Sequence, residues 1–172
     1  MYAVYYVVLL AVGFERIAEL VVAKRNAAWS LARGGVESGF GHYPVMVVLH
    51  VGLLVGCLIE PIAGHRTFEP LLAWPMIALV LAAQGLRWWC IATLGPQWNT
   101  RVIVVPGLPL VRTGPYRWFN HPNYVAVVVE GAALPLAGSA WITAVTFACL
   151  NAALLTVRLR CEVRALAATA TT

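Results

Sequence analysis

Charge is scarce in this chain, and one acidic residue type is absent altogether. Lys, Arg, Asp and Glu make up 11% of the 172 residues, and all 7 acidic residues are Glu. An average soluble domain is about 25% charged. With 61% hydrophobic residues and a mean hydropathy of +0.79, the chain has more apolar surface than one water-exposed globule can bury. The composition therefore excludes an ordinary soluble fold and predicts an integral membrane protein.

The sequence also lacks paired cysteines and metal-binding motifs. The 4 Cys lie in or at the ends of apolar stretches without a CxxC pair, and the 4 His show no HExxH or i,i+4 spacing. We interpret the cysteines as small apolar side chains and expect no metal site. No polar domain is available to display a basic surface, so the excess of 12 basic over 7 acidic residues does not indicate nucleic-acid binding.

Apolar segments are the main feature that is present. Crossing a bilayer takes about 20 mainly apolar residues. The five candidate spans are 2–23, 43–63, 71–94, 123–137 and 139–157. The fourth is short and is separated from the fifth only by Gly138, which predicts a tight helical hairpin. The predicted fold class is an all-α integral membrane protein with about five transmembrane helices.

Basic residues in the connections predict the orientation, because cytoplasmic loops carry an excess of Lys and Arg. With the N-terminus outside, Arg66 is the single basic loop residue on the outer side. Nine then lie inside, namely Lys24, Arg25, Arg33, Arg101, Arg112, Arg117, Arg158, Arg160 and Arg164. We therefore expect the C-terminus and the long polar loop 95–122 to face the cytoplasm. The connection 24–42 is expected to be a loop or an interfacial helix.

Ionisable side chains inside the predicted spans are costly, so each is expected to pair or to mark a site. Those at bilayer depth are Glu15, Arg16, Glu19, His50, Arg87 and Glu130. An ion pair within the first span or with Arg87 is one expectation. Glu130 has two interpretations, an Arg partner or contact with a polar substrate. His50 likewise either bonds a backbone carbonyl or another helix, or lines a binding site.

The densest group of unusual residues lies at 97–130. Prolines and glycines fix or free the backbone there, and aromatic side chains offer faces for a flat heterocycle or a cation. This composition predicts a preorganised cofactor loop. An interfacial aromatic belt would explain Trp118 and Phe119, but it would not explain the sequence from His121 to Tyr124.

The stretch LVRTGPYRWFNHPNYV at 110–125 resembles the signature of the isoprenylcysteine carboxyl methyltransferase family, integral membrane enzymes that use S-adenosylmethionine. That family has a Gly-x-Tyr turn, an Arg-His-Pro-x-Tyr motif, a helical hairpin and a final Arg-x-x-x-Glu. The matching residues are Gly114, Tyr116, His121, Pro122, Tyr124, Arg158 and Glu162. Asn120 departs from the family's Arg, and Glu162 is a single acid where many members have several. Asn120 itself or the neighbouring Arg117 would have to take over that Arg's role.

The N-terminal half is similar to a bacterial branch of this family through ERIAELVVAKRN and RGGVESGFGHYP, and WNTRVIVVPG adds to the match. That branch resembles enzymes that O-methylate alkylpyrones and alkylresorcinols made by type III polyketide synthases. The resemblance implies a bacterial plasma membrane location. It also implies an acceptor-side region at 1–94 and a methyltransferase core at 95–166, followed by a tail at 167–172 that we expect to be disordered. Oligomeric state stays open.

The resemblance further implies a division of roles. Arg158 would hold the acceptor oxyanion, and Glu162 would hydrogen-bond to amino or hydroxyl groups of the cofactor, so these two are the predicted catalytic residues. The predicted cofactor-binding residues are Leu108, Pro109, Leu110, Val111, Gly114, Tyr116, His121, Pro122, Asn123, Tyr124 and Glu162. The predicted substrate-binding residues are Arg158, Glu130, Arg87, Trp98 and His50.

The expected activity is O-methyl transfer from S-adenosylmethionine to a lipophilic oxyanion, leaving S-adenosylhomocysteine. An alkylpyrone-type hydroxyl is preferred over a prenylcysteine-like carboxylate. Both are ionised or nearly so at neutral pH, so no strong general base is needed, and membrane lipid is the expected surrounding. Two other classes stay open: a membrane-embedded NADPH-dependent reductase with a similar C-terminal hairpin, and a non-enzymatic channel or assembly subunit. The proline and aromatic density of the loop disfavours the latter.

Overall fold

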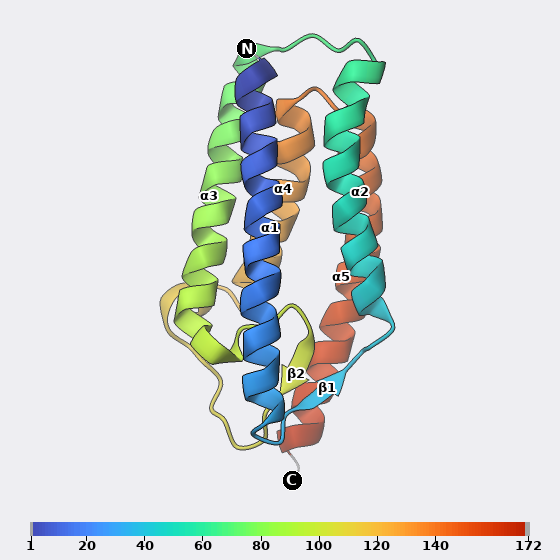
Figure 1. Ribbon diagram of the computed structural model, residues 1–172. Coiled ribbons are helices and arrows are strands. Elements are labelled where there is room, and N and C mark those ends of the chain that lie inside the picture. The colour runs from blue at the N-terminus through green and yellow to red at the C-terminus, as the bar shows by residue number, and fades with distance from the viewer. Residues whose placement is uncertain (1, 171–172) are drawn as a thin grey trace.

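The computed structural model describes residues 2–170, with side chains through residue 166. Five helices alternate in direction and form one elongated bundle (Figure 1). They are α1 (Tyr2–Leu31), α2 (His42–Ala63), α3 (Pro70–Leu94), α4 (Pro122–Ala137) and α5 (Trp141–Ala170). Two single turns of 3-10 helix, η1 (Gly95–Gln97) and η2 (Gly114–Arg117), lie in the long connection between α3 and α4. The all-α membrane fold class is confirmed.

Three of these helices are long and apolar enough to cross a membrane by length and composition. They are α2, α3 together with η1, and α5 as far as Leu166. Of the other two predicted spans, α4 is apolar but has 16 residues. The 30-residue α1 carries Glu15, Arg16 and Glu19 near its centre. Both nevertheless run along the same axis as the three longer helices (Figure 1).

A small β-sheet that the sequence did not predict joins two connections at the lower end of the bundle. β1 (Val36–Ser38) pairs antiparallel with β2 (Val102–Val104), with Glu37 opposite Ile103. The connection after residue 24 is thus a continuation of α1 to Leu31 followed by a strand. Three-residue strands carry too little alternation to be recognised in a sequence, and the pairing brings together residues far apart in the chain.

The helix boundaries follow from local backbone chemistry. Proline stands at the first position of α3 and of α4, where its missing N–H costs nothing and its fixed φ suits a helix. Gly95 ends α3 with a φ of +54°, and its N–H bonds to the carbonyl of Ile91. At the other end of the chain, α5 continues to Ala170 and so enters the segment for which we expected disorder. Alanine is the strongest helix former, which favours this extension. Residues 171 and 172 lie outside the described residues.

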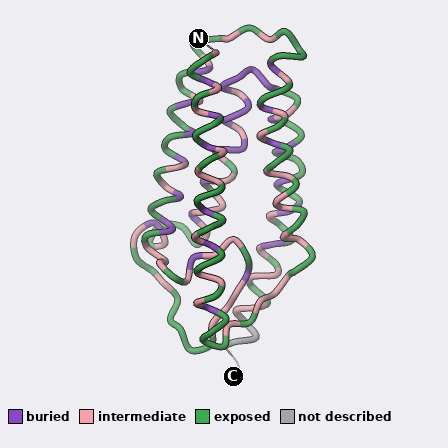
Figure 2. Tube along the Cα trace, in the orientation of Figure 1, coloured by how far each residue is buried: buried purple, intermediate pink, exposed green. Residues whose placement is uncertain are grey.

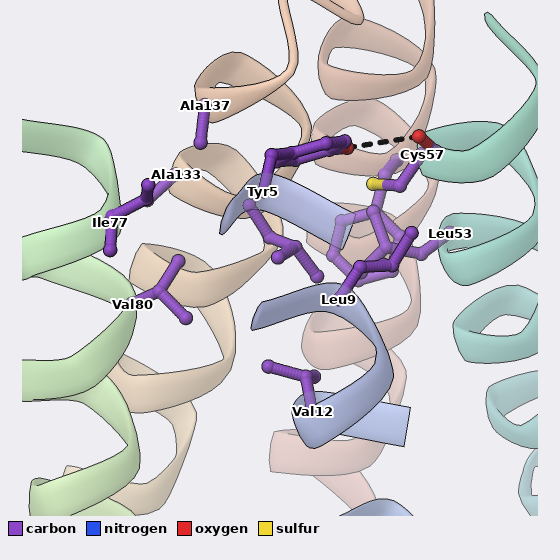
Figure 3. Close-up of a cluster of buried hydrophobic side chains, with 11 residues drawn as sticks. Tyr5, Leu9, Val12, Leu53, Cys57, Ile77, Val80, Ala133 and Ala137 are labelled. Atoms are coloured by element: carbon purple, nitrogen blue, oxygen red, sulfur yellow. Dashed lines mark hydrogen bonds between the residues drawn. The ribbon is translucent and has the colours of Figure 1, made fainter. Parts of the chain in front are cut away.

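The hydrophobic core lies in the upper half of the bundle and draws on all five helices (Figure 3). Tyr5 is fully buried there, and its hydroxyl donates a 2.9 Å hydrogen bond to the carbonyl oxygen of Cys57 on α2. Many apolar residues of the same helices are exposed, as expected where lipid replaces water. Figure 2 shows exposed residues recurring along the helices. The core draws on residues from both sides of the division expected between residues 94 and 95, so the two regions expected from the sequence share one interior.

We predict that Gly131→Ala in α4 destabilises the protein by about 1–3 kcal/mol, the usual cost of overpacking. A Cβ at this position would lie 2.1 Å from Cε1 of Phe147, which is itself 3% exposed. Gly85→Ala in α3 is the matched control, since nothing lies within 4 Å of its Cβ position, and we expect no loss there. Thermal unfolding in detergent measures both changes. Equal unfolding temperatures of the two variants would contradict this account of the packing.

Candidate functional site

One large cavity of about 950 Å³ opens in the lower half of the bundle, between the helices and the long α3–α4 connection. Its lining includes most of the residues that the sequence singled out. These are Leu108, Pro109, Leu110, Val111, Tyr116, His121, Asn123, Tyr124, Arg158, Glu162, Trp98, His50 and Arg87. Gly114, Pro122 and Glu130 do not line the cavity. The segment 97–124 and the end of α5 therefore lie around the same space.

A compact group lies where the N-terminal end of α4 meets the last turns of α5. It consists of Glu162, His121 and Tyr124. The Tyr124 hydroxyl donates a 2.9 Å hydrogen bond to Oε2 of Glu162, and Nδ1 of His121 lies 3.7 Å from the same oxygen. The His121 and Tyr124 rings stack with centroids 5.3 Å apart. Glu162 keeps 29% of its side chain exposed and lines the cavity, so this carboxylate is accessible to a ligand that donates hydrogen bonds.

Arg158 is a buried cation without a counterion among the described residues. It is 5% exposed, and its two terminal nitrogens lie 2.9 Å from Sδ of Met46 and 2.8 Å from the carbonyl oxygen of Thr100. Its guanidinium carbon is 6.0 Å from the centre of the Tyr124 ring. Burying a charge is expensive unless an opposite charge compensates it. The geometry therefore points to an anion in this part of the cavity.

The 3-10 turn η2 holds the loop against α3. Tyr116 lies against the thiol of Cys90, and burial raises the pKa of its phenol above the ordinary value, so Tyr116 stays protonated and forms part of the cavity wall. Gly114 has a φ of +55°, and a Cβ there would lie 2.5 Å from Oγ1 of Thr93. Gly114 thus positions the loop without lining the cavity. Pro122 does not line the cavity either: it is buried and is the first residue of α4.

Four charged side chains form a buried ion cluster at the inner end of the cavity. Glu130 Oε2 accepts from Arg87 at 2.6 Å and from Arg16 at 3.1 Å. Glu19 is 2.9 Å from Arg16 and 3.3 Å from Arg87 through its two oxygens. Of the two interpretations of Glu130, the structure shows the Arg partner. The cluster holds two positive and two negative charges, so Arg87 faces the cavity already neutralised.

His50 and Trp98 occupy the wall near this cluster. The Nδ1 atom of His50 is 2.8 Å from the backbone carbonyl oxygen of Met46. A bond to a backbone carbonyl was one of the possibilities that the sequence left open for this residue. The carbonyl can only accept, so the other ring nitrogen of neutral His50 has a free lone pair. Trp98 is 2% exposed, and its Nε1 has no hydrogen-bond partner among the described residues.

Several cavity residues were missed by sequence reasoning. Asn151 on α5 is 3% exposed, lines the cavity and has an Oδ1 without a partner among the described residues. Arg112 and Asn99 also line it. A lone asparagine in an apolar helix was the available signal for Asn151, since a buried amide in a bilayer needs a partner. Asn120 and Arg117 both line the cavity, where either can take the place of the missing family Arg.

Comparison with known proteins agrees with the arrangement around this cavity, which is that of a membrane enzyme with a loop-and-hairpin ligand site. Residues 76–168 match the Isoprenylcysteine carboxyl methyltransferase (ICMT) family. The chain belongs to this family, and it is accordingly an integral membrane protein of a methyltransferase family. The matched range includes the whole loop, α4 and most of α5.

A curated relative extends the similarity to most of the chain. This relative is Uncharacterized protein YpbQ of Bacillus subtilis (strain 168). The two chains are 38% identical over 153 residues, which cover 88% of this chain and 90% of that protein. No solved structure matches the chain. The relative carries no assigned activity, so the likeness adds coverage of α1 and α2 and leaves the acceptor unassigned.

We predict that Glu130→Gln lowers the free energy of unfolding by about 3–5 kcal/mol, because it leaves an uncompensated positive charge in the buried ion cluster. Glu69→Gln serves as the control, since Glu69 is exposed and its carboxylate accepts from the nearby Thr67 hydroxyl, a bond that an amide oxygen can also accept; we expect a change within about 0.5 kcal/mol. Thermal unfolding of both purified variants in detergent measures these two changes in stability. Indistinguishable curves would show that the cluster does not stabilise the bundle.

Proposed function

We propose that the protein is an S-adenosylmethionine-dependent O-methyltransferase whose acceptor is a lipophilic oxyanion. The observation that carries this proposal is Arg158, a buried guanidinium that lines the cavity with no acidic partner among the described residues. An ionised oxygen of the acceptor would supply the missing counterion. Such an oxygen is already a nucleophile, so its methylation needs no strong general base.

The residues around the loop fit the cofactor that the family implies. S-adenosylmethionine carries an ammonium, a carboxylate, ribose hydroxyls and an adenine amino group. Glu162 and the unpartnered Oδ1 of Asn123 are acceptors for its donors, and Arg112 and Arg117 are cations for its carboxylate. When bound, the cofactor supplies a methyl group activated by a positively charged sulfur. This chain's part is to hold both ligands in one water-poor space and to align them, which contributes much of the rate in such reactions.

The inner part of the cavity wall suits a lipophilic acceptor. Beyond Arg158 the wall is formed largely by aliphatic side chains, namely Leu20, Val47, Val51, Leu54, Val127, Leu154 and Leu155. Within the proposed class we favour an alkylpyrone or alkylresorcinol of the type III polyketide kind, on the resemblance of the N-terminal half to that bacterial branch. A prenylcysteine-like carboxylate is the alternative acceptor. Both pair a negative oxygen with a long apolar chain.

We also propose that the cavity faces the cytoplasm of a bacterial cell, with the N-terminus outside. The lower end of the bundle, where the loops and α5's last turns lie (Figure 1), carries almost all of the basic loop residues. A soluble cofactor would then enter from the cytoplasm through the loop, while the acceptor stays within the membrane.

We predict that the purified protein binds S-adenosylhomocysteine and that Glu162→Gln weakens this binding about 10-fold to 150-fold, the range for losing a hydrogen bond to a charged group. The amide keeps an oxygen that accepts from Tyr124, so the local packing is preserved. Isothermal titration calorimetry measures the affinity, with Glu69→Gln as the unaffected control. Binding of NADPH in place of S-adenosylhomocysteine would contradict the proposal and favour a reductase.

We predict that Arg158→Ala lowers methyl transfer to an alkylpyrone acceptor by about 10²–10³, the effect of removing an oxyanion donor. His50→Ala should lose far less, since one His50 nitrogen is already engaged by a backbone carbonyl. The measurement is transfer of labelled methyl from S-adenosylmethionine to the acceptor by purified variants.

Two controls keep this test sharp. Arg158→Ala should still bind S-adenosylhomocysteine, which separates a lost acceptor contact from a misfolded cavity. A farnesylcysteine analogue run in parallel distinguishes the acceptor classes: labelling of that analogue alone would overturn the alkylpyrone preference. Full methyl-transfer activity of the Arg158→Ala variant would contradict the assignment of Arg158 as the contact of the acceptor oxyanion.

A further inference from the structure

A second, shallower groove lies on the outside of the bundle, on the opposite face of α5 from the cavity. It has a volume of about 560 Å³ and is lined by Ser38, His42, Val157, Arg160, Cys161 and Arg164, with Ala165 at its edge. The segments concerned, β1, the start of α2 and the last turns of α5, lie side by side at the lower end of the molecule (Figure 1). None of these residues takes part in the proposed methyl transfer.

Helical geometry separates the two faces of α5. Arg158 and Glu162 are four residues apart and point into the cavity, whereas Arg160 and Arg164 are each two residues further on. Two residues correspond to a rotation of about 200° around a helix with 3.6 residues per turn. Both of these arginines are exposed, whereas Arg158 is 5% exposed. The basic pair therefore faces away from the active-site cavity.

The positive charge of this groove is not compensated within the described part of the chain. The ion pairs found at this end join Arg101 to Glu37 and His121 to Glu162, and neither includes Arg160 or Arg164. The first turn of α2 adds to the positive potential, since Gly41 at its N-cap supplies no side-chain hydrogen bond. A guanidinium matches a phosphate in geometry as well as in charge.

The groove is also built tightly enough to hold its shape. Gly39, which directly follows β1, has a φ of +73°, and a Cβ there would lie 2.0 Å from Cε1 of His42 and 2.8 Å from Sγ of Cys161. The Gly39 backbone therefore packs closely against both the imidazole and the thiol. The basic groove thus has a packed floor, unlike a pair of free surface arginines.

Along α5 the lining changes from apolar to basic in the direction of the chain end. Val157, Arg160, Cys161 and Arg164 follow the spacing of one helix face, and the exposed Leu150 and Val157 continue that face into the apolar part of the helix. A ligand that matches this change from apolar to basic lining has an anionic headgroup and a hydrophobic tail. Soluble phosphate would use the head region alone.

We propose that this groove binds the phosphate headgroup of an anionic phospholipid from the surrounding leaflet, with Arg160 and Arg164 as its cationic contacts and the acyl chains along the apolar side of α5. Basic pockets beside transmembrane helices bind such headgroups through the same charge complementarity. The proposal does not depend on the methyltransferase assignment, because it uses a different face and different residues.

The test compares lipid binding by the full-length protein and two double variants. Arg160→Gln with Arg164→Gln removes the basic pair, and Lys24→Gln with Arg25→Gln removes two exposed charges from the same end of the molecule outside the groove. Native mass spectrometry of protein in detergent, titrated with phosphatidylglycerol and with phosphatidylcholine, measures retained lipid. Inorganic phosphate is titrated as a separate competitor.

We expect the wild-type protein to retain phosphatidylglycerol in preference to phosphatidylcholine. Removing the arginine pair should weaken that binding roughly 30-fold, and the Lys24 and Arg25 variant should stay within about threefold of wild type. Unchanged binding by the arginine variant, or an equal loss in the control, would overturn the proposal. Displacement by inorganic phosphate at concentrations comparable to the lipid would assign the groove to free phosphate and overturn the lipid assignment.

Discussion

The buried ion cluster of Arg16, Glu19, Arg87 and Glu130 is the interaction on which the lower half of the bundle depends. It joins α1, α3 and α4, three helices that otherwise have apolar surfaces and gain little from excluding water inside a bilayer. Each charge would be costly alone in that setting. Together they cancel, and their geometry fixes how the three helices face one another.

This cluster also marks a boundary inside the molecule. On one side of it lies the tightly packed apolar core around Tyr5 and Leu134, and on the other side lies the cavity lined by Arg158, Trp98 and the α3–α4 loop. The cluster forms the inner end of that cavity. In the proposed complex, a ligand would meet a wall whose charges are already paired, and its own negative charge would pair with Arg158, which has no counterion among the described residues.

The helix α5 connects several parts of the structure. Its inner face presents Asn151, Arg158 and Glu162 to the cavity, and its outer face presents the basic groove. The hydrogen bond from Arg158 to the carbonyl oxygen of Thr100 ties the loop to α5, and the hydrogen bond from Tyr124 to Glu162 ties the start of α4 to it. The family match covers this same region, where the loop, α4 and α5 meet.

The sequence by itself determined the membrane class, the number and order of the five helices and the family, because hydropathy, prolines and the HPxY segment are local signals. It also placed Arg158 and Glu162 on one helix face through their spacing of four. It did not determine that α1 continues to Leu31 or α5 to Ala170. It could not decide that Glu130 pairs with Arg87 and Arg16, that β1 and β2 form a sheet, or that Asn151 reaches the cavity. Those outcomes depend on contacts between helices distant in the chain, and in a bilayer such contacts are set by side-chain packing and charge pairing between helices whose apolar surfaces look alike.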